Sequence, residues 1–212
     1  SANGNVIVSM AANMVRDKAG NLNPAATPLS VAYDTARPTV TLASDRTITN
    51  DTFLLTVTFS EVMKAFNEGM LTLSNCSAAV PVEVNPGRVW TVVITASINP
   101  ATVKISENAV EDLAGNRNTE SNTVQVEYDF AQPGFELSPA SLVPTNIRPI
   151  AFSVLSDEFV NGLAANDFEV TPATATVVNI AQTTAGRAWN VSVNFVDPNP
   201  IAIVENVGLT LK

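Results

Sequence analysis

The sequence contains no histidine, only one cysteine, and fewer basic than acidic residues. Without histidine, the chain lacks the commonest general base and the commonest transition-metal ligand among the side chains. The single Cys76 excludes an internal disulfide. Eleven basic and twenty acidic residues give a net charge of −9, and the basic residues are not clustered. Such a surface repels nucleic acid and anionic lipid, so we predict no nucleic-acid partner.

Long apolar runs are also missing. No stretch approaches the roughly 20 apolar residues of a membrane helix, and no basic segment precedes an apolar one at the front of the chain. We therefore predict no membrane insertion. The first residue is serine rather than methionine, so we expect a mature or excised piece of a longer protein.

What the chain does contain is typical of β-strands. Apolar residues make up 46% of the sequence, and Thr, Ser and Asn supply many of the polar positions. Short alternating segments are separated by Asn, Gly, Pro and Ser, which favours strands joined by turns. Seven such segments between residues 36 and 130 predict an all-β, antiparallel β-sandwich. They are residues 38–44, 53–60, 70–74, 78–84, 88–96, 101–106 and 122–128.

Several segments occur twice. "RDKAGN" at residues 16–21 resembles "EDLAGN" at residues 111–116, and Tyr33-Asp34 corresponds to Tyr128-Asp129. "GRVWTVVI" (87–94) matches "GRAWNVSV" (186–193), and "INPATVKISEN" resembles "PNPIAIVEN". Matches along the whole chain indicate a repeat of nearly one hundred residues.

The repeat predicts three parts. Residues 1–35 are the C-terminal part of a preceding unit, residues 36–130 are a complete unit, and residues 131–212 are a unit that lacks its last strand. The connectors "YDTARP" and "YDFAQP" are short and contain proline, so we expect semi-rigid joints and an elongated row of sandwiches.

The strand that precedes "RDKAGN", the connector "YDTARPTV" and the segment "FLLTVTFSEVMKAF" together resemble the bacterial Ig-like repeats of large surface adhesins. The resemblance is strong over residues 1–130 and weak over residues 131–212. It implies tandem Ig-like antiparallel β-sandwiches, an extracellular or cell-surface location, and frequent Ca²⁺ binding near the joints between domains.

The two "DxAGN" loops offer candidate Ca²⁺ ligands, since Ca²⁺ takes carboxylate, amide and carbonyl oxygens. Asp17, Asn21 and Asp34 form one predicted set, and Asp112, Asn116 and Asp129 form the other. Glu61 in "FSE" is a further candidate ligand. The alternative is that both loops are plain turns, in which the aspartate caps backbone N–H groups and the glycine adopts a positive φ.

Three asparagines satisfy the N-x-S/T rule for glycosylation: Asn50, Asn75 and Asn190. Trp90 and Trp189 occupy equivalent positions of the repeat, and we expect both in the core. No nucleophile motif or phosphate-binding glycine loop is present, so we predict that the protein is not an enzyme.

Three functions stay open at this point. The first is a structural or adhesion stalk of tandem Ig-like repeats that projects or links at the cell surface, with neighbouring repeats as partners. The second is a subunit of a fibre assembled head to tail, in which residues 1–35 of one copy complement residues 131–212 of another. The third is a module that binds a cell-surface receptor or a glycan through its loops.

Overall fold

The computed structural model describes residues 3–141, 145, 147–171, 174–195 and 208–211. Over these residues the regular secondary structure is β-strand, apart from two single-turn 3₁₀-helices, Glu68–Met70 and Ala165–Asp167, and there is no α-helix. Two compact units are present, Ser1–Phe130 and Ala131–Lys212. The predicted all-β fold class with antiparallel sheets is confirmed.

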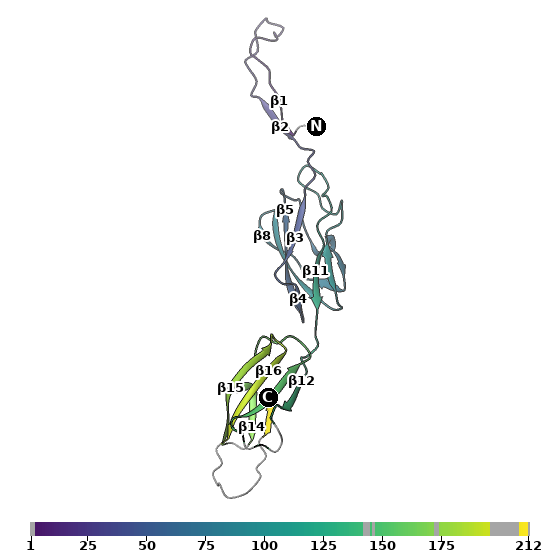
Figure 1. Ribbon diagram of the computed structural model, residues 1–212. Helices are drawn as coiled ribbons and strands as arrows, with labels where there is room; N and C mark the ends of the chain where they lie inside the picture. Colours follow the sequence, from purple (N-terminus) through teal and green to yellow (C-terminus); the bar gives the residue numbers. More distant parts are fainter. Residues whose placement is uncertain (1–2, 142–144, 146, 172–173, 196–207, 212) are drawn as a thin grey trace. The chain divides into compact units, whose positions relative to one another are not determined.

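Residues 36–130 form a sandwich of two sheets (Figure 1). Alternation along β5 places Phe53, Leu55, Val57 and Phe59 in the core between them. The first sheet has the order β3 (Val40–Ser44), β5 (Thr52–Phe59), β9 (Val89–Ala96) and β7 (Cys76–Ala78), and β8 (Val82–Asn85) also pairs with β9. The second sheet has the order β4 (Ile48–Thr49), β11 (Val124–Tyr128), β10 (Ala101–Lys104) and β6 (Thr72–Ser74).

Two strands differ from the sequence prediction. Of the segment expected at 78–84, Ala78 ends β7 and residues 82–84 belong to β8, and both strands pair with β9. Pro81 lies between them, and proline has no N–H to donate to a ladder. The short strand β4 was not predicted, because two residues carry no alternation. It pairs in parallel with the end of β11.

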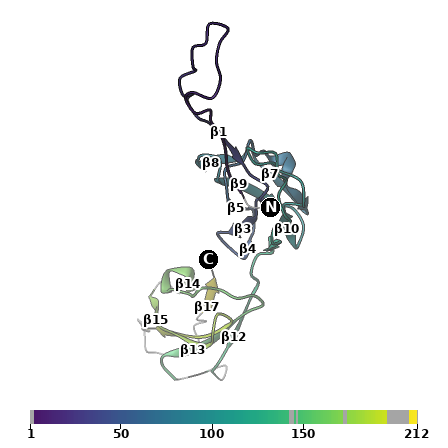
Figure 2. The same cartoon turned by 90° about the horizontal axis from the view of Figure 1, so that it is seen from above.

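Residues 131–212 contain a second, smaller sandwich. One sheet has the order β12 (Phe135–Pro139), β13 (Ile150–Ser156), β16 (Ala188–Phe195) and β15 (Ala175–Thr184). Figure 2 shows β14 (Phe168–Thr171) and β17 (Gly208–Leu211) opposite this sheet. The repeat segment "PNPIAIVEN" lies outside the described residues. Strand β17 pairs with β14 in the way that β10 pairs with β6 in the first sandwich.

The first strands, β1 (Gly4–Val8) and β2 (Leu29–Tyr33), form a hairpin that pairs with no other described strand. Its hydrogen bonds repeat those of the hairpin β10–β11 at positions 95 residues later. Val8 pairs with Leu29 as Val103 pairs with Val124. The loops share the backbone bonds Asp17 N to Asn21 O and Asp112 N to Asn116 O, at 2.9 and 3.0 Å. The sequence repeat is therefore also a repeat of backbone geometry over these residues.

Candidate cation site

Asp112 lies in a tight loop after β10, and its carboxylate is fixed by its own loop. The backbone N–H of Asn116 donates to Asp112 Oδ1 at 2.8 Å, and Asn116 Nδ2 donates to Oδ2 at 2.9 Å. Gly115 has a φ of 95°, a conformation that side-chain-bearing residues rarely adopt. The loop therefore holds one carboxylate in a defined orientation.

The entry to the sandwich brings a second carboxylate to this loop. Asn116 Nδ2 also donates to the backbone carbonyl of Asp34, at 3.3 Å. Arg37 attaches the same entry segment to the loop, with Nε donating to Arg117 O at 2.9 Å and Nη2 to Asn118 O at 2.7 Å. These three hydrogen bonds join the entry segment to the loop, and they hold Asp34 beside Asp112.

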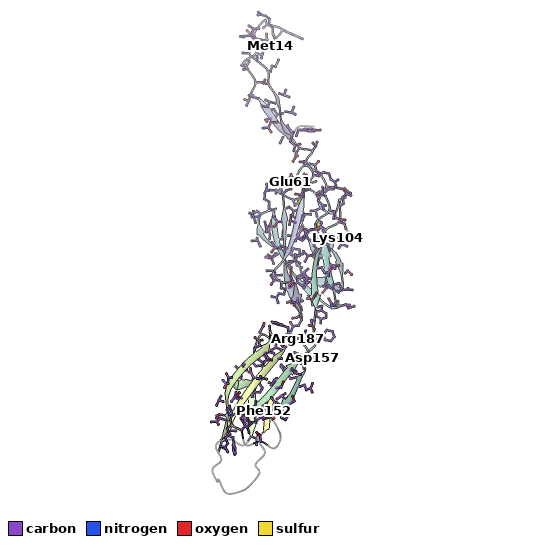
Figure 3. All side chains as sticks on the ribbon, viewed as in Figure 1. Met14, Glu61, Lys104, Phe152, Asp157 and Arg187 are labelled. Carbon is purple, nitrogen blue, oxygen red and sulfur yellow. The ribbon has the colours of Figure 1, made fainter. Side chains whose placement is uncertain are left out.

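The third carboxylate, Glu61, follows strand β5 at one end of the sandwich (Figure 3). One carboxylate oxygen each from Asp34, Glu61 and Asp112 lies within 4.8 Å of the others. Oxygens that share a calcium ion at about 2.3–2.6 Å lie no more than about 5 Å apart. The spacing of the three oxygens therefore fits a common calcium ion.

The electrostatics of the cluster favour a cation. Burial, followed by the charges of Asp112 and Asp34, raises the pKa of Glu61 above its ordinary value, although Arg88 opposes this. Asp112 is almost completely buried, and its burial disfavours the charged form. Its hydrogen bonds from Asn116 and from backbone N–H groups nevertheless lower its pKa overall. The carboxylate of Asp112 is thus fixed beside those of Asp34 and Glu61, and a bound cation would relieve the repulsion among the three.

The structure groups the predicted ligands differently from the two predicted sets. Asp34 lies with Asp112 and Asn116, whereas Asp17 and Asn21 lie in the hairpin loop, where Asn21 Nδ2 donates to Asp17 Oδ2 at 2.9 Å. Asp129 follows the end of β11, and its N–H donates to Thr49 O at 2.9 Å. Glu61, which the sequence offered as a further candidate ligand outside both sets, is the residue that lies with Asp34 and Asp112.

The other residues considered from the sequence lie as follows. Asn50 is exposed in the turn before β5, and Asn190 is exposed on the outer side of β16. Asn75 is half-buried, and its Nδ2 donates to Pro100 O at 2.8 Å. Trp90 and Trp189 are buried in the two cores, as expected.

A sandwich of two sheets that are antiparallel apart from the short β4–β11 pair belongs to the immunoglobulin-like class. Residues 34–128, less than half of the chain, match the family model described as a bacterial Ig-like domain. The matched range includes all three clustered carboxylates. No curated protein and no solved structure matched the chain. Among the described residues, no helix has the length and apolar character needed to span a membrane.

Proposed function

We propose that the chain is a structural part of an extracellular protein, a stalk of Ig-like repeats that projects or links at the cell surface. The observation that carries this proposal is the repeated hairpin. The same strand register and loop hydrogen bonds occur in β1–β2 and in β10–β11, immediately before and at the end of the segment that matches a bacterial Ig-like domain. A serial arrangement of such units suits mechanical reach rather than catalysis.

The strand order of residues 36–130 supports a load-bearing role. β4, near the start of the domain, pairs in parallel with the end of β11, near its exit. The N–H groups of Glu127 and Asp129 donate to Thr47 O and Thr49 O, each at 2.9 Å. Tension on the two ends of the domain pulls these strands in opposite directions along their length. The hydrogen bonds between β4 and β11 are then loaded together, in shear. Bonds loaded in this way resist separation better than bonds that break one after another.

An antibody raised against the purified chain tests the location. We expect it to label intact cells of the source organism to the same extent as permeabilised cells. Labelling that appears only after permeabilisation would contradict the proposal. An antibody against a cytoplasmic protein of the same cells is the control for intactness.

We further propose that Ca²⁺ binds to Asp34, Glu61 and Asp112 and stabilises the entry of the domain. The three carboxylates supply part of the six to eight oxygens that Ca²⁺ takes, and water or backbone carbonyls would supply the rest. At a concentration one hundred times its Kd, a ligand of the folded state stabilises by about 2.7 kcal/mol. For a domain of this size we expect the melting temperature to rise by roughly 10 °C or more.

Calorimetry with Ca²⁺ and with EDTA tests the cation site, and the repeated loop provides a matched control. Asp112→Asn should abolish the difference in melting temperature between the two conditions. Asp17→Asn changes the same position of the same loop motif, outside the carboxylate cluster, and should leave the difference intact. If chelation does not move the transition of the unmodified chain, or if both variants respond alike, no calcium site exists at Asp112.

A further inference from the structure

The outer face of the larger sheet in residues 36–130 carries no charged side chain. The strands β3, β5, β9, β7 and β8, all of which the structure describes, contain one charged residue, Glu83. Glu83 lies opposite the core residue Trp90, so it is on the inner side of its strand, where it accepts a hydrogen bond from Gly87 N. By the same alternation, the outward positions of the sheet are Thr41, Ala43, Thr52, Leu54, Thr56, Thr58, Ser77, Val82, Asn85, Val89, Thr91, Val93 and Thr95.

The centre of this outer face is apolar. Leu54 of β5 lies opposite Val93 of β9, and these are the two central strands of the sheet. Leu54 is 39% exposed and Val93 is 45% exposed. Val82 of β8, which is 63% exposed, extends the apolar area toward the edge of the sheet. Most of the remaining outward side chains are threonines, so the face consists mainly of methyl groups and hydroxyls.

The repeated sheet in residues 131–212 shows that strand formation does not require this apolar centre. The two sheets keep a tryptophan at the same register of the core. On the outer side, however, the pair that corresponds to Leu54–Val93 is Ala151–Ser192. The same two strands therefore pair with small or polar residues outward. An exposed apolar patch that the sheet does not need for its own formation indicates a contact surface.

The distribution of charge indicates that the partner for this face is a second copy of the chain. The net charge is −9, so two copies repel each other over surfaces that carry carboxylates. The opposite sheet is such a surface, because β10 and β11 place Lys104 and Glu127 outward (Figure 1). A basic partner would gain most from carboxylates, which the outer face of the larger sheet lacks. A second acidic copy gains from their exclusion, because the two faces then meet without like charges opposite each other.

We propose that two copies pack the outer faces of their larger sheets together in residues 36–130, with Leu54 and Val93 at the centre of a two-fold contact. Both copies use the same patch, so the contact is isologous and closes as a dimer. Four strands at about 4.8 Å and eight residues at about 3.4 Å give a face of roughly 500 Å² per copy. Two such faces bury about 1,000 Å², the lower limit for a specific interface, so we expect a dissociation constant in the micromolar to submillimolar range. This contact depends neither on the proposed location nor on the cation site.

Sedimentation velocity of the full chain, from micromolar to submillimolar concentration, tests the dimer. We expect a reversible dimer that salt strengthens, because salt screens the repulsion between two acidic copies. Leu54→Glu should weaken dimerisation by at least about 100-fold, because the two-fold contact brings two like charges into an apolar patch. Gln125→Glu is the matched control, since it adds the same charge at an exposed position of the opposite sheet and should leave the dissociation constant nearly unchanged. Both positions are exposed, so both variants should fold, and the fluorescence of Trp90 in urea checks this.

A mixture of two charge variants tests whether the same patch is used on both copies. Leu54→Glu and Leu54→Lys should each be monomeric alone, whereas an equimolar mixture of the two should dimerise, because opposite charges then meet at the two-fold contact. The proposal is overturned by an unmodified chain that is monomeric at every concentration, or by equal effects of Leu54→Glu and Gln125→Glu. It is also overturned if the unmodified chain dimerises but the mixture does not, since the contact would then lie on another surface.

Discussion

Replacing Val126 and Val31 by alanine compares one substitution in two copies of the same hairpin. Both valines lie at the corresponding position of the last strand, in the same register, and they differ in burial. Val126→Ala removes two fully buried methyl groups, worth about 1.6 kcal/mol at about 0.8 kcal/mol each. The cavity that remains adds a further cost, so we expect a total loss of roughly 2–3 kcal/mol. Val31→Ala changes an exposed side chain and should cost less than about 0.5 kcal/mol.

Urea unfolding followed by tryptophan fluorescence measures the difference. The chain has two tryptophans, and a Trp189→Phe background restricts the signal to Trp90 in the core of residues 36–130. At an m-value of about 1–3 kcal/mol/M, the expected loss lowers the midpoint by roughly 0.7–3 M for Val126→Ala. Equal midpoints for the two alanine variants would refute the assignment of Val126 to the core and of Val31 to an uncovered face.

Three further substitutions test other parts of the domain. Glu61→Gln should raise the melting temperature slightly in EDTA, because it removes like-charge repulsion, and should lower it in Ca²⁺, because it removes a proposed ligand. A shift of the melting temperature in the same direction under both conditions would contradict the cation site. Asn118→Ala should cost about 2–3 kcal/mol in urea unfolding, since the buried amide holds its loop, whereas Asn23→Ala, in the exposed copy, should leave the Trp90 transition unchanged. Gly87→Ala should cost about 1–3 kcal/mol by the same assay, because Gly87 has a φ of 66° and an added Cβ would meet the side chain of Val62; an unchanged midpoint would contradict this turn geometry.

Most of the fold was predictable because the strands alternate and the turns contain their characteristic residues. β5 shows this clearly, with every second residue buried from Phe53 to Phe59. β4 was not predictable, since its pairing with β11 depends on a contact between residues about 80 positions apart. The interruption of the 78–84 segment was not predictable either. Pro81 cannot donate a hydrogen bond, but this breaks a strand only where the neighbouring strand needs that donor, and the sequence does not show where that is.

The candidate site was only partly predictable for a related reason. The Asp-Asn contact within each loop is local, and the sequence motif indicates it directly. The meeting of Asp34, Glu61 and Asp112 requires three segments that are remote in sequence. Spacing alone placed Asp34 with the nearer loop, which contains Asp17. The fold places it with the farther loop, because the chain enters the sandwich beside Asn116.

The two loops separate what the motif encodes from what the fold adds. In both loops the aspartate accepts from the backbone and the side chain of the asparagine four residues later, although one loop is exposed and the other packs on a core. The motif therefore specifies a capped turn without help from tertiary contacts. It does not specify the carboxylate cluster, which needs Glu61 and Asp34 as well. In a chain with this motif, a glutamate two residues after the strand that corresponds to β5, together with an aspartate at the domain entry, is the combination that brings three carboxylates together.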